Sequence, residues 1–203
     1  MSALLAPSDA LAESQRLIAA LERRRDELPF ADDVLAIHRP THENLARSSV
    51  RSDDAVEVWR AALARRWECE VVGRRLYKQG VRQLAEHYGR EAPEVQLLSR
   101  GGAEADSSPA ELLRDLRRLQ AALELTRASL PGAADRLDEV GRECAALAAA
   151  IADAATREEQ RRTAALDRRM AQEAYRRARA TTRRALLDHY GGAMAAEFAE
   201  LFV

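Results

Sequence analysis

The chain has 203 residues, of which 47% are hydrophobic and only 4% aromatic, and its formal net charge is −1. This apolar content suffices for one sizeable core or two small ones, and the near-zero charge argues against a protein drawn as a whole to a polyanion. Alanine, leucine and arginine dominate, which is typical of long helices. The two cysteines, Cys69 and Cys144, form neither a metal-spacing motif nor a disulfide framework, so we expect small core thiols in a reducing compartment.

The most informative feature is an internal repeat with a spacing of 102 residues. Residues 7–89 align without a gap on residues 109–191, and about 27 of the 83 aligned positions are identical. Such self-similarity predicts that one helical unit was duplicated and its copies fused. We therefore divide the chain into a first helical hairpin repeat, a flexible polar linker, a second hairpin repeat and an apolar C-terminal tail, at residues 1–98, 99–108, 109–191 and 192–203.

The first helix of each repeat is predicted at residues 8–27 and 109–129. Leucines at steps of three, four and seven make an apolar stripe in both, and a Leu-Pro step interrupts both. The first repeat then carries polar and proline-containing stretches between His38 and Asp54, which predict a loop. The corresponding part of the second repeat, within 133–190, predicts either one very long helix or two helices with a bend near residues 153–156.

The last helix of each repeat is predicted at about residues 54–88 and 157–190. Both end in His-Tyr-Gly, where glycine suits a left-handed cap and histidine suits the helix dipole. We expect an all-α fold in which the duplicated hairpins form a four-helix-type bundle with long, coiled-coil-like helices. Gly73 in the first repeat aligns with Tyr175 in the second, which predicts that Tyr175 packs over Gly73 across a pseudo-twofold axis.

Motifs for catalysis or metal binding are not evident. The sequence has no glycine-rich phosphate loop and no nucleophile motif, and no histidine follows a glutamate by three residues as a di-iron bundle requires. His38 and His42 have the spacing of two ligands on a helical turn, but Pro40 lies between them. We expect no catalytic residues, no metal and no cofactor; an enzyme or ligand carrier with a site between helices is the third alternative.

A row of arginine pairs in the last helix of the second repeat supports a nucleic-acid alternative. The pairs recur at steps of seven or eight and so follow one side of the helix, as a phosphate-binding stripe would. The competing interpretation is a solvated face paired with acidic neighbours. The arginines are Arg161, Arg162, Arg168, Arg169, Arg176, Arg177, Arg183 and Arg184.

The C-terminal tail has an apolar stripe formed by Met194, Phe198, Leu201 and Phe202. It either folds back onto the end of the bundle or docks on another subunit. We expect a non-enzymatic structural or interaction protein that self-associates through this tail, as an assembly or filament subunit. The N-terminus resembles no signal peptide and no run is long enough to span a membrane, so we expect a cytoplasmic protein whose main partner is itself.

Overall fold

The computed structural model describes residues 7–99, 108–192 and 196–202. These residues form helices and no strand, so the all-α prediction is confirmed for this part of the chain. In chain order the elements are α1 (Pro7–Arg23), α2 (Ala31–Tyr88), α3 (Pro93–Ser99), α4 (Pro109–Leu125), α5 (Ala133–His189), α6 (Ala196–Ala199) and the 3₁₀-helix η1 (Glu200–Phe202).

Helix α2 is continuous through the stretch for which we predicted a loop, so that prediction is wrong. Pro40 lies inside the helix, on its exposed side. A proline there removes one backbone hydrogen bond and costs roughly 3 kcal/mol. Every seventh residue from Ala31 through His38 and Leu45 is nevertheless buried, and this packing offsets the cost.

Helix α5 is also a single helix, Ala133–His189, which answers the question left open for the second repeat. It has no proline. Its buried residues Val140, Leu147 and Ala154 follow at steps of seven. An apolar residue on the same side in every second turn packs this part of the helix against its neighbours.

The elements begin at positions that keep the 102-residue spacing. Helices α1 and α4 both have 17 residues and start at Pro7 and Pro109. They end four residues earlier than we predicted. The glycines after the two long helices, Gly89 and Gly191, have positive φ as expected of left-handed caps. The duplication itself stays a prediction.

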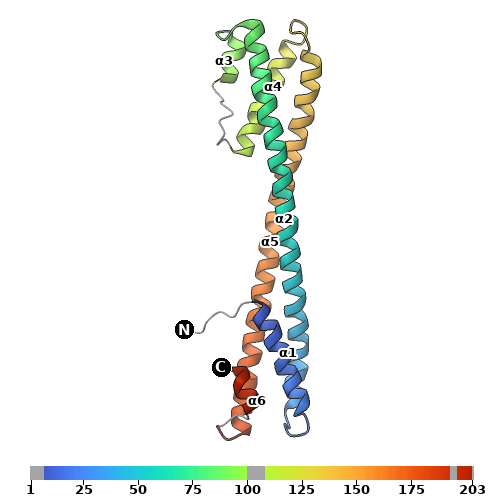
Figure 1. The fold of residues 1–203 in the computed structure, drawn as a ribbon, viewed down its shortest axis with the longest axis vertical. Helices are drawn as coiled ribbons and strands as arrows, with labels where there is room; N and C mark the ends of the chain where they lie inside the picture. The colour runs from blue at the N-terminus through green and yellow to red at the C-terminus, as the bar shows by residue number, and fades with distance from the viewer. Residues whose placement is uncertain (1–6, 100–107, 193–195, 203) are drawn as a thin grey trace. The chain divides into compact units, whose positions relative to one another are not determined.

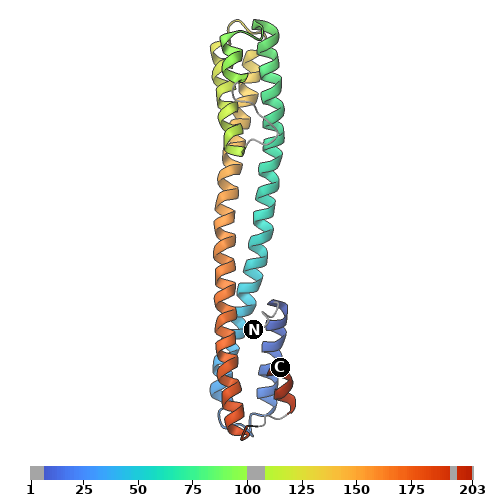
Figure 2. The same cartoon turned by 90° about the vertical axis from the view of Figure 1, so that its left-hand side faces the viewer.

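The chain forms two compact units that do not follow the division into repeats. Unit 1 comprises residues 1–56 and 160–203, and unit 2 comprises residues 57–159. In each unit a part of α2 runs antiparallel to a part of α5, with α1 beside them in unit 1 and α4 in unit 2 (Figures 1 and 2). Each unit therefore combines the short first helix of one repeat with the last helical segment of the other.

The core of unit 2 forms where α4 packs on α2. Gly73 and Gly80 of α2 lie against leucines of α4: a Cβ at Gly80 would come within 2.7 Å of Leu119 Cδ2, and one at Gly73 within 3.0 Å of Leu116 Cδ1. Glycine thus permits close contact between the helices. Tyr175 belongs to a different core, in unit 1, so the predicted packing of Tyr175 over Gly73 is wrong.

The core of unit 1 consists of two clusters. Helices α1, α2 and α5 contribute to both, and Phe198 of α6 joins the larger one. The buried members are Leu17, Ala20, Leu21, Leu28, Ala31, Val34, Leu35, Leu186 and Phe198 in the first cluster, and Ala10, Leu45, Ala171 and Tyr175 in the second. Across the described ranges, no helix is both long and apolar enough to cross a membrane.

Candidate interaction surface

Unit 1 contains a buried polar pair, His38 of α2 and Thr182 of α5. His38 Nε2 lies 2.8 Å from Thr182 Oγ1, and the hydroxyl donates its only hydrogen to the Ala178 carbonyl oxygen at 3.0 Å. Nε2 must therefore be the donor to Thr182, which leaves Nδ1 of the neutral ring unprotonated. Nδ1 is buried and has no partner in the described structure, and burial lowers the pKa of His38.

This pair holds two helices together and does not form a reactive site. His38 is fully buried and Thr182 nearly so, and the ring of Tyr175 packs edge-on against His38 at 6.2 Å between centroids. A general base must reach a substrate proton, and no face of this imidazole meets solvent. In unit 2 the aligned residues are Val140 and Gly80, so the polar pair is specific to unit 1.

Arg179 of α5 anchors the C-terminal segment. Its guanidinium forms an ion pair with the buried Glu13 of α1, donates to the Leu201 carbonyl oxygen at 2.8 Å and lies 5.1 Å from the centroid of the Phe202 ring. These three contacts of Arg179 fix η1 against α1 and α5. Unit 2 uses the aligned residue, Tyr77, in the same way.

The hydroxyl of Tyr77 donates to the Leu98 carbonyl oxygen at 2.6 Å and thereby holds α3. Burial and the nearby carboxylate of Asp115 raise the pKa of Tyr77 to about 12. Asp115 is itself the residue aligned with Glu13. Both units therefore anchor the short helix that follows a long helix through aligned positions of that long helix, of which Tyr77 is buried and Arg179 is half-buried.

The tail is covered within its own unit. Phe198 is 0% exposed, Leu201 and Phe202 are half-buried, and Glu197 forms ion pairs with Arg23 and Arg24 of α1. Met194 lies outside the described residues. This placement corresponds to the tail that folds back, and Phe198 offers no surface to a partner while it stays there. Self-association through the tail stays a prediction, and it requires release of the tail.

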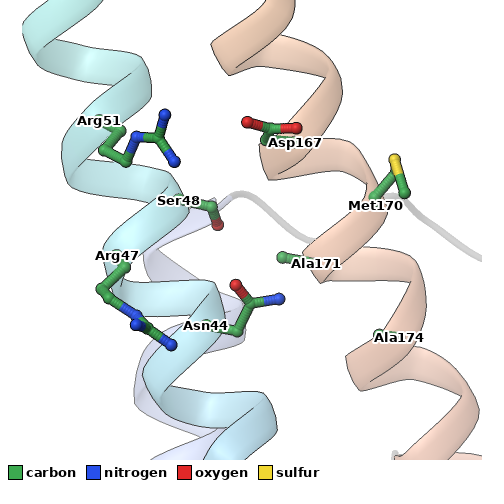
Figure 3. A pocket seen from close by; sticks show the side chains of 8 residues that line it. All are labelled: Asn44, Arg47, Ser48, Arg51, Asp167, Met170, Ala171 and Ala174. Atoms are coloured by element: carbon green, nitrogen blue, oxygen red, sulfur yellow. The ribbon is translucent and has the colours of Figure 1, made fainter.

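A different surface of unit 1 is uncovered. On the side of the α2–α5 pair away from α1, an open groove of about 440 Å³ runs between the helices (Figure 3). Together with the exposed apolar residues Ile37 and Leu166, this groove is called the open face here. The residues that line the groove are Asn44, Arg47, Ser48 and Arg51 of α2 and Asp167, Met170, Ala171 and Ala174 of α5.

The floor of the open face is made of small residues and its rims are apolar and charged. Ser48 and Ala171 are buried between the helices, whereas Met170 is 71% exposed, Leu166 56% and Ile37 52%. Large apolar side chains left in water beside a groove of this kind mark interaction sites. The geometry suits an α-helix, which would lay side chains into the groove at every third or fourth residue.

Unpaired charges accompany these apolar side chains. In the part of the chain that the structure describes, neither Arg47 nor Arg51 forms an ion pair, although many other arginines do, such as Arg39 with Glu22 at 2.8 Å. Asp167 lies across the groove from Arg51, and no ion pair joins them. The α2 side of this surface was not predicted, because the local sequence of residues 38–54 indicates a loop. The seven-residue spacing of Ala31, His38, Leu45 and Ser52 was the signal that could have revealed it.

The arginine row on α5 is partly neutralised. Arg168 forms an ion pair with Asp53 of α2 at 2.9 Å, and Arg176 and Arg177 both pair with Glu173. Arg161 and Arg162 also interact with neighbouring groups. Among the described residues, ion pairs are lacking for Arg169, Arg183 and Arg184, which are exposed. The row is thus a mixed-charge helix surface over much of its length.

In the described ranges, no three His, Cys, Asp or Glu side chains are arranged to hold a metal ion. Comparison of the chain with protein-family models, with curated proteins and with solved structures finds no match. The case for a function therefore depends on the surfaces of the molecule itself.

Proposed function

We propose that the chain is a non-enzymatic structural or interaction protein that self-associates, and that the open face of unit 1 carries the contact. The observation that supports this is the exposure of Met170 at the groove, of Leu166 one turn before it on α5 and of Ile37 two turns before Asn44 on α2. Each such side chain contributes roughly 1.5–3 kcal/mol when it is fully buried. Burying three such side chains on each of two copies yields enough free energy to exceed the entropy cost of association and to sustain a specific contact.

The nucleic-acid alternative has less support. A phosphate-binding stripe needs cations that are free to displace counterions, and the acids of α2 and α5 already pair with several arginines of the row. Arg183 and Arg184 remain as the strongest candidates for it. Retention on DNA or RNA that falls steeply with salt, and that is lost with Arg183→Ala and Arg184→Ala, would favour this alternative.

The oligomeric state of the purified full chain tests the proposal. We expect light scattering to show an oligomer that dissociates on dilution, and we expect Met170→Asp to shift it toward the monomer. Val50→Asp is the matched control, because Val50 is 60% exposed in the same unit and lies on another side of α2. Circular dichroism would check that both variants keep their helical content.

A wild-type chain that stays monomeric at high concentration would overturn the proposal. If Val50→Asp dissociates the oligomer as strongly as Met170→Asp, the open face is not the contact. If only removal of residues 192–203 dissociates it and the truncated chain stays folded, the tail is the contact instead.

A further inference from the structure

We infer that four positions on the long helices select the pairing of α2 with α5 in one chain over the pairing of each long helix with its counterpart in a second copy. The positions are Gly73 and Gly80 of α2 and Tyr175 and Thr182 of α5, which the 102-residue spacing aligns in pairs. The inference concerns the cores of the two units and does not depend on the proposed function.

The competing pairing follows from the likeness of the two long helices. Helices α2 and α5 have 58 and 57 residues, and they align with each other at the 102-residue spacing. The first part of each long helix lies antiparallel to the last part of the other. Two copies of α2 placed antiparallel would bring together the same kinds of segment. The last part of α2 must therefore differ from the last part of α5 in a way that the short helices recognise.

In unit 2 the short helix carries large residues and the long helix carries none opposite them. A Cβ at Gly73 would come within 3.0 Å of Leu116 Cδ1 and 3.4 Å of Leu112 Cδ2. A Cβ at Gly80 would come within 2.7 Å of Leu119 Cδ2. The three leucines are fully buried. Helix α4 thus requires glycine at both positions of its long partner, because a side chain there would overpack the core.

In unit 1 the sizes are reversed. The position of Gly73 is taken by Tyr175, which is 1% exposed and shares a core cluster with Ala10 of α1. Where α4 has two leucines, α1 has Ala10 and Ser14, and both are buried. Burial, and then the nearby Glu13 carboxylate, raise the pKa of Tyr175, so its hydroxyl lies beside α1. Helix α1 therefore offers small side chains where its long partner carries a tyrosine.

Pairing each long helix with its counterpart would combine the wrong sizes. If α2 paired with a second α2, α1 would place Ala10 and Ser14 opposite Gly73, which leaves a cavity and a buried hydroxyl. If α5 paired with a second α5, α4 would press its leucines against Tyr175 and overpack the core. Only the pairing of α2 with α5 matches large residues with small ones in both units.

The buried polar pair of unit 1 acts in the same direction. In the structure, His38 Nε2 donates to the hydroxyl of Thr182. If α2 paired with a second α2, His38 would face Gly80, and its buried N–H would have no acceptor. If α5 paired with a second α5, Thr182 would face Val140, which cannot donate to it. Size and polarity thus favour the same choice of partner.

Three full-length chains of identical composition test the inference: the wild type, a four-residue exchange and a ten-residue exchange. The four-residue exchange consists of Gly73→Tyr, Gly80→Thr, Tyr175→Gly and Thr182→Gly. The ten-residue exchange adds the reciprocal changes at the opposing positions, which are Ala10→Leu, Ser14→Leu, His38→Val, Leu112→Ala, Leu116→Ser and Val140→His. It restores the match of α2 with α5 with the two units interchanged.

We expect the four-residue exchange to lower the melting temperature in dilute solution by at least about 10 °C, because the contacts at all four positions become mismatched. Refolding from urea at high protein concentration should give a dimer in which each long helix pairs with its counterpart. This dimer should persist on dilution, because its separation requires unfolding. The ten-residue exchange should recover at least half of the lost melting temperature and should not form the persistent dimer.

Equal stability of the four-residue exchange and the wild type would overturn the inference. A ten-residue exchange that is no more stable than the four-residue exchange would overturn it too, because the damage would then lie elsewhere. So would a four-residue exchange that folds but forms no persistent dimer at any concentration. If the four-residue exchange does not fold at all, a cooperative melt regained in the ten-residue exchange supports the inference. The open-face oligomer of the proposed function is told apart by its dissociation on dilution.

Discussion

Gly80 offers the sharpest test of the packing in unit 2. A Cβ at this position would lie 2.7 and 2.8 Å from the two Cδ atoms of Leu119 and 3.2 Å from its Cγ. Leu119 is fully buried, so it has little room to move. Alanine gains about 1 kcal/mol in helix propensity over glycine, whereas overpacking a core costs about 1–3 kcal/mol. We expect Gly80→Ala to lower the free energy of unfolding by up to about 2 kcal/mol.

Gly141→Ala is the matched control for this substitution. Gly141 also lies within a long helix of unit 2, but a Cβ there meets only the flexible end of Gln120, at 3.3 Å. We expect Gly141→Ala to raise the free energy of unfolding by about 0.5–1 kcal/mol, the propensity gain alone. Urea unfolding followed by circular dichroism would measure both variants. Equal stabilisation by Gly80→Ala and Gly141→Ala would show that Leu119 does not crowd a side chain at Gly80.

A double-mutant cycle would locate the cost of Gly80→Ala. Leu119→Val removes one methylene and should itself destabilise unit 2 by about 1 kcal/mol. If the crowding lies between these two residues, the double variant should be more stable than the sum of the single changes indicates, with a coupling of about 0.5–2 kcal/mol. Exact additivity would place the strain elsewhere.

Three further predictions follow from the buried contacts. The pKa of His38 is lowered in the folded state, so below about pH 6.5 the unfolded chain takes up a proton at His38 while the folded chain does not. The free energy of unfolding should therefore fall by at most about 1.4 kcal/mol per pH unit between pH 6.5 and the pKa of His38 in the folded state. His38→Val, which introduces the residue found at the aligned position 140, should reduce the difference in unfolding free energy between pH 7 and pH 5, as measured by urea unfolding. Phe198→Ala should cost about 3–5 kcal/mol in thermal or urea unfolding if the tail is core, and no loss would show that it is not. Tyr77→Phe removes the hydrogen bond to the Leu98 carbonyl and should cost about 0.5–1.5 kcal/mol, with faster hydrogen exchange confined to α3 as the check.

The helical class, the starts of α1 and α4 and the ends of α2 and α5 could be predicted from composition and from local sequence signals. The starts of α1 and α4 were marked by Pro7 and Pro109, and Ser108 caps α4 by accepting from the backbone N–H of Glu111. These signals are local, because a proline or a capping side chain acts on its own turn. They hold whatever the rest of the chain does.

The course of α2 could not be predicted from local signals. Pro40 and the serines near residue 50 favour a break when the segment is considered by itself. The buried Leu45, Ser48 and Ser52 gain their stabilising contacts from residues more than a hundred positions later in the chain, such as Ala171. Long-range packing of this kind overrides propensity and leaves only a seven-residue periodicity as a trace.

The same limit applies to the candidate surface. Phe198 and Met170 are both large apolar residues on helices, and the sequence does not distinguish the one that is buried from the one that is exposed. The difference arises because α1 covers one side of the α2–α5 pair in unit 1 and leaves the other uncovered. Burial is thus decided by which helices become neighbours.

The composition of the two units has a consequence for the order of folding during synthesis. Unit 2 is built from one uninterrupted stretch, residues 57–159, whereas unit 1 joins residues 1–56 to residues 160–203. On the ribosome the partners of unit 2 emerge within about a hundred residues of one another, whereas α1 meets its partners in α2 early and its partners in α5 and α6 only after residues 160–203 emerge. The leucines of α1 are therefore covered only by the start of α2 until residues 160–203 have been synthesised. Nascent chains are most open to wrong pairing, or to capture by a chaperone, in this interval.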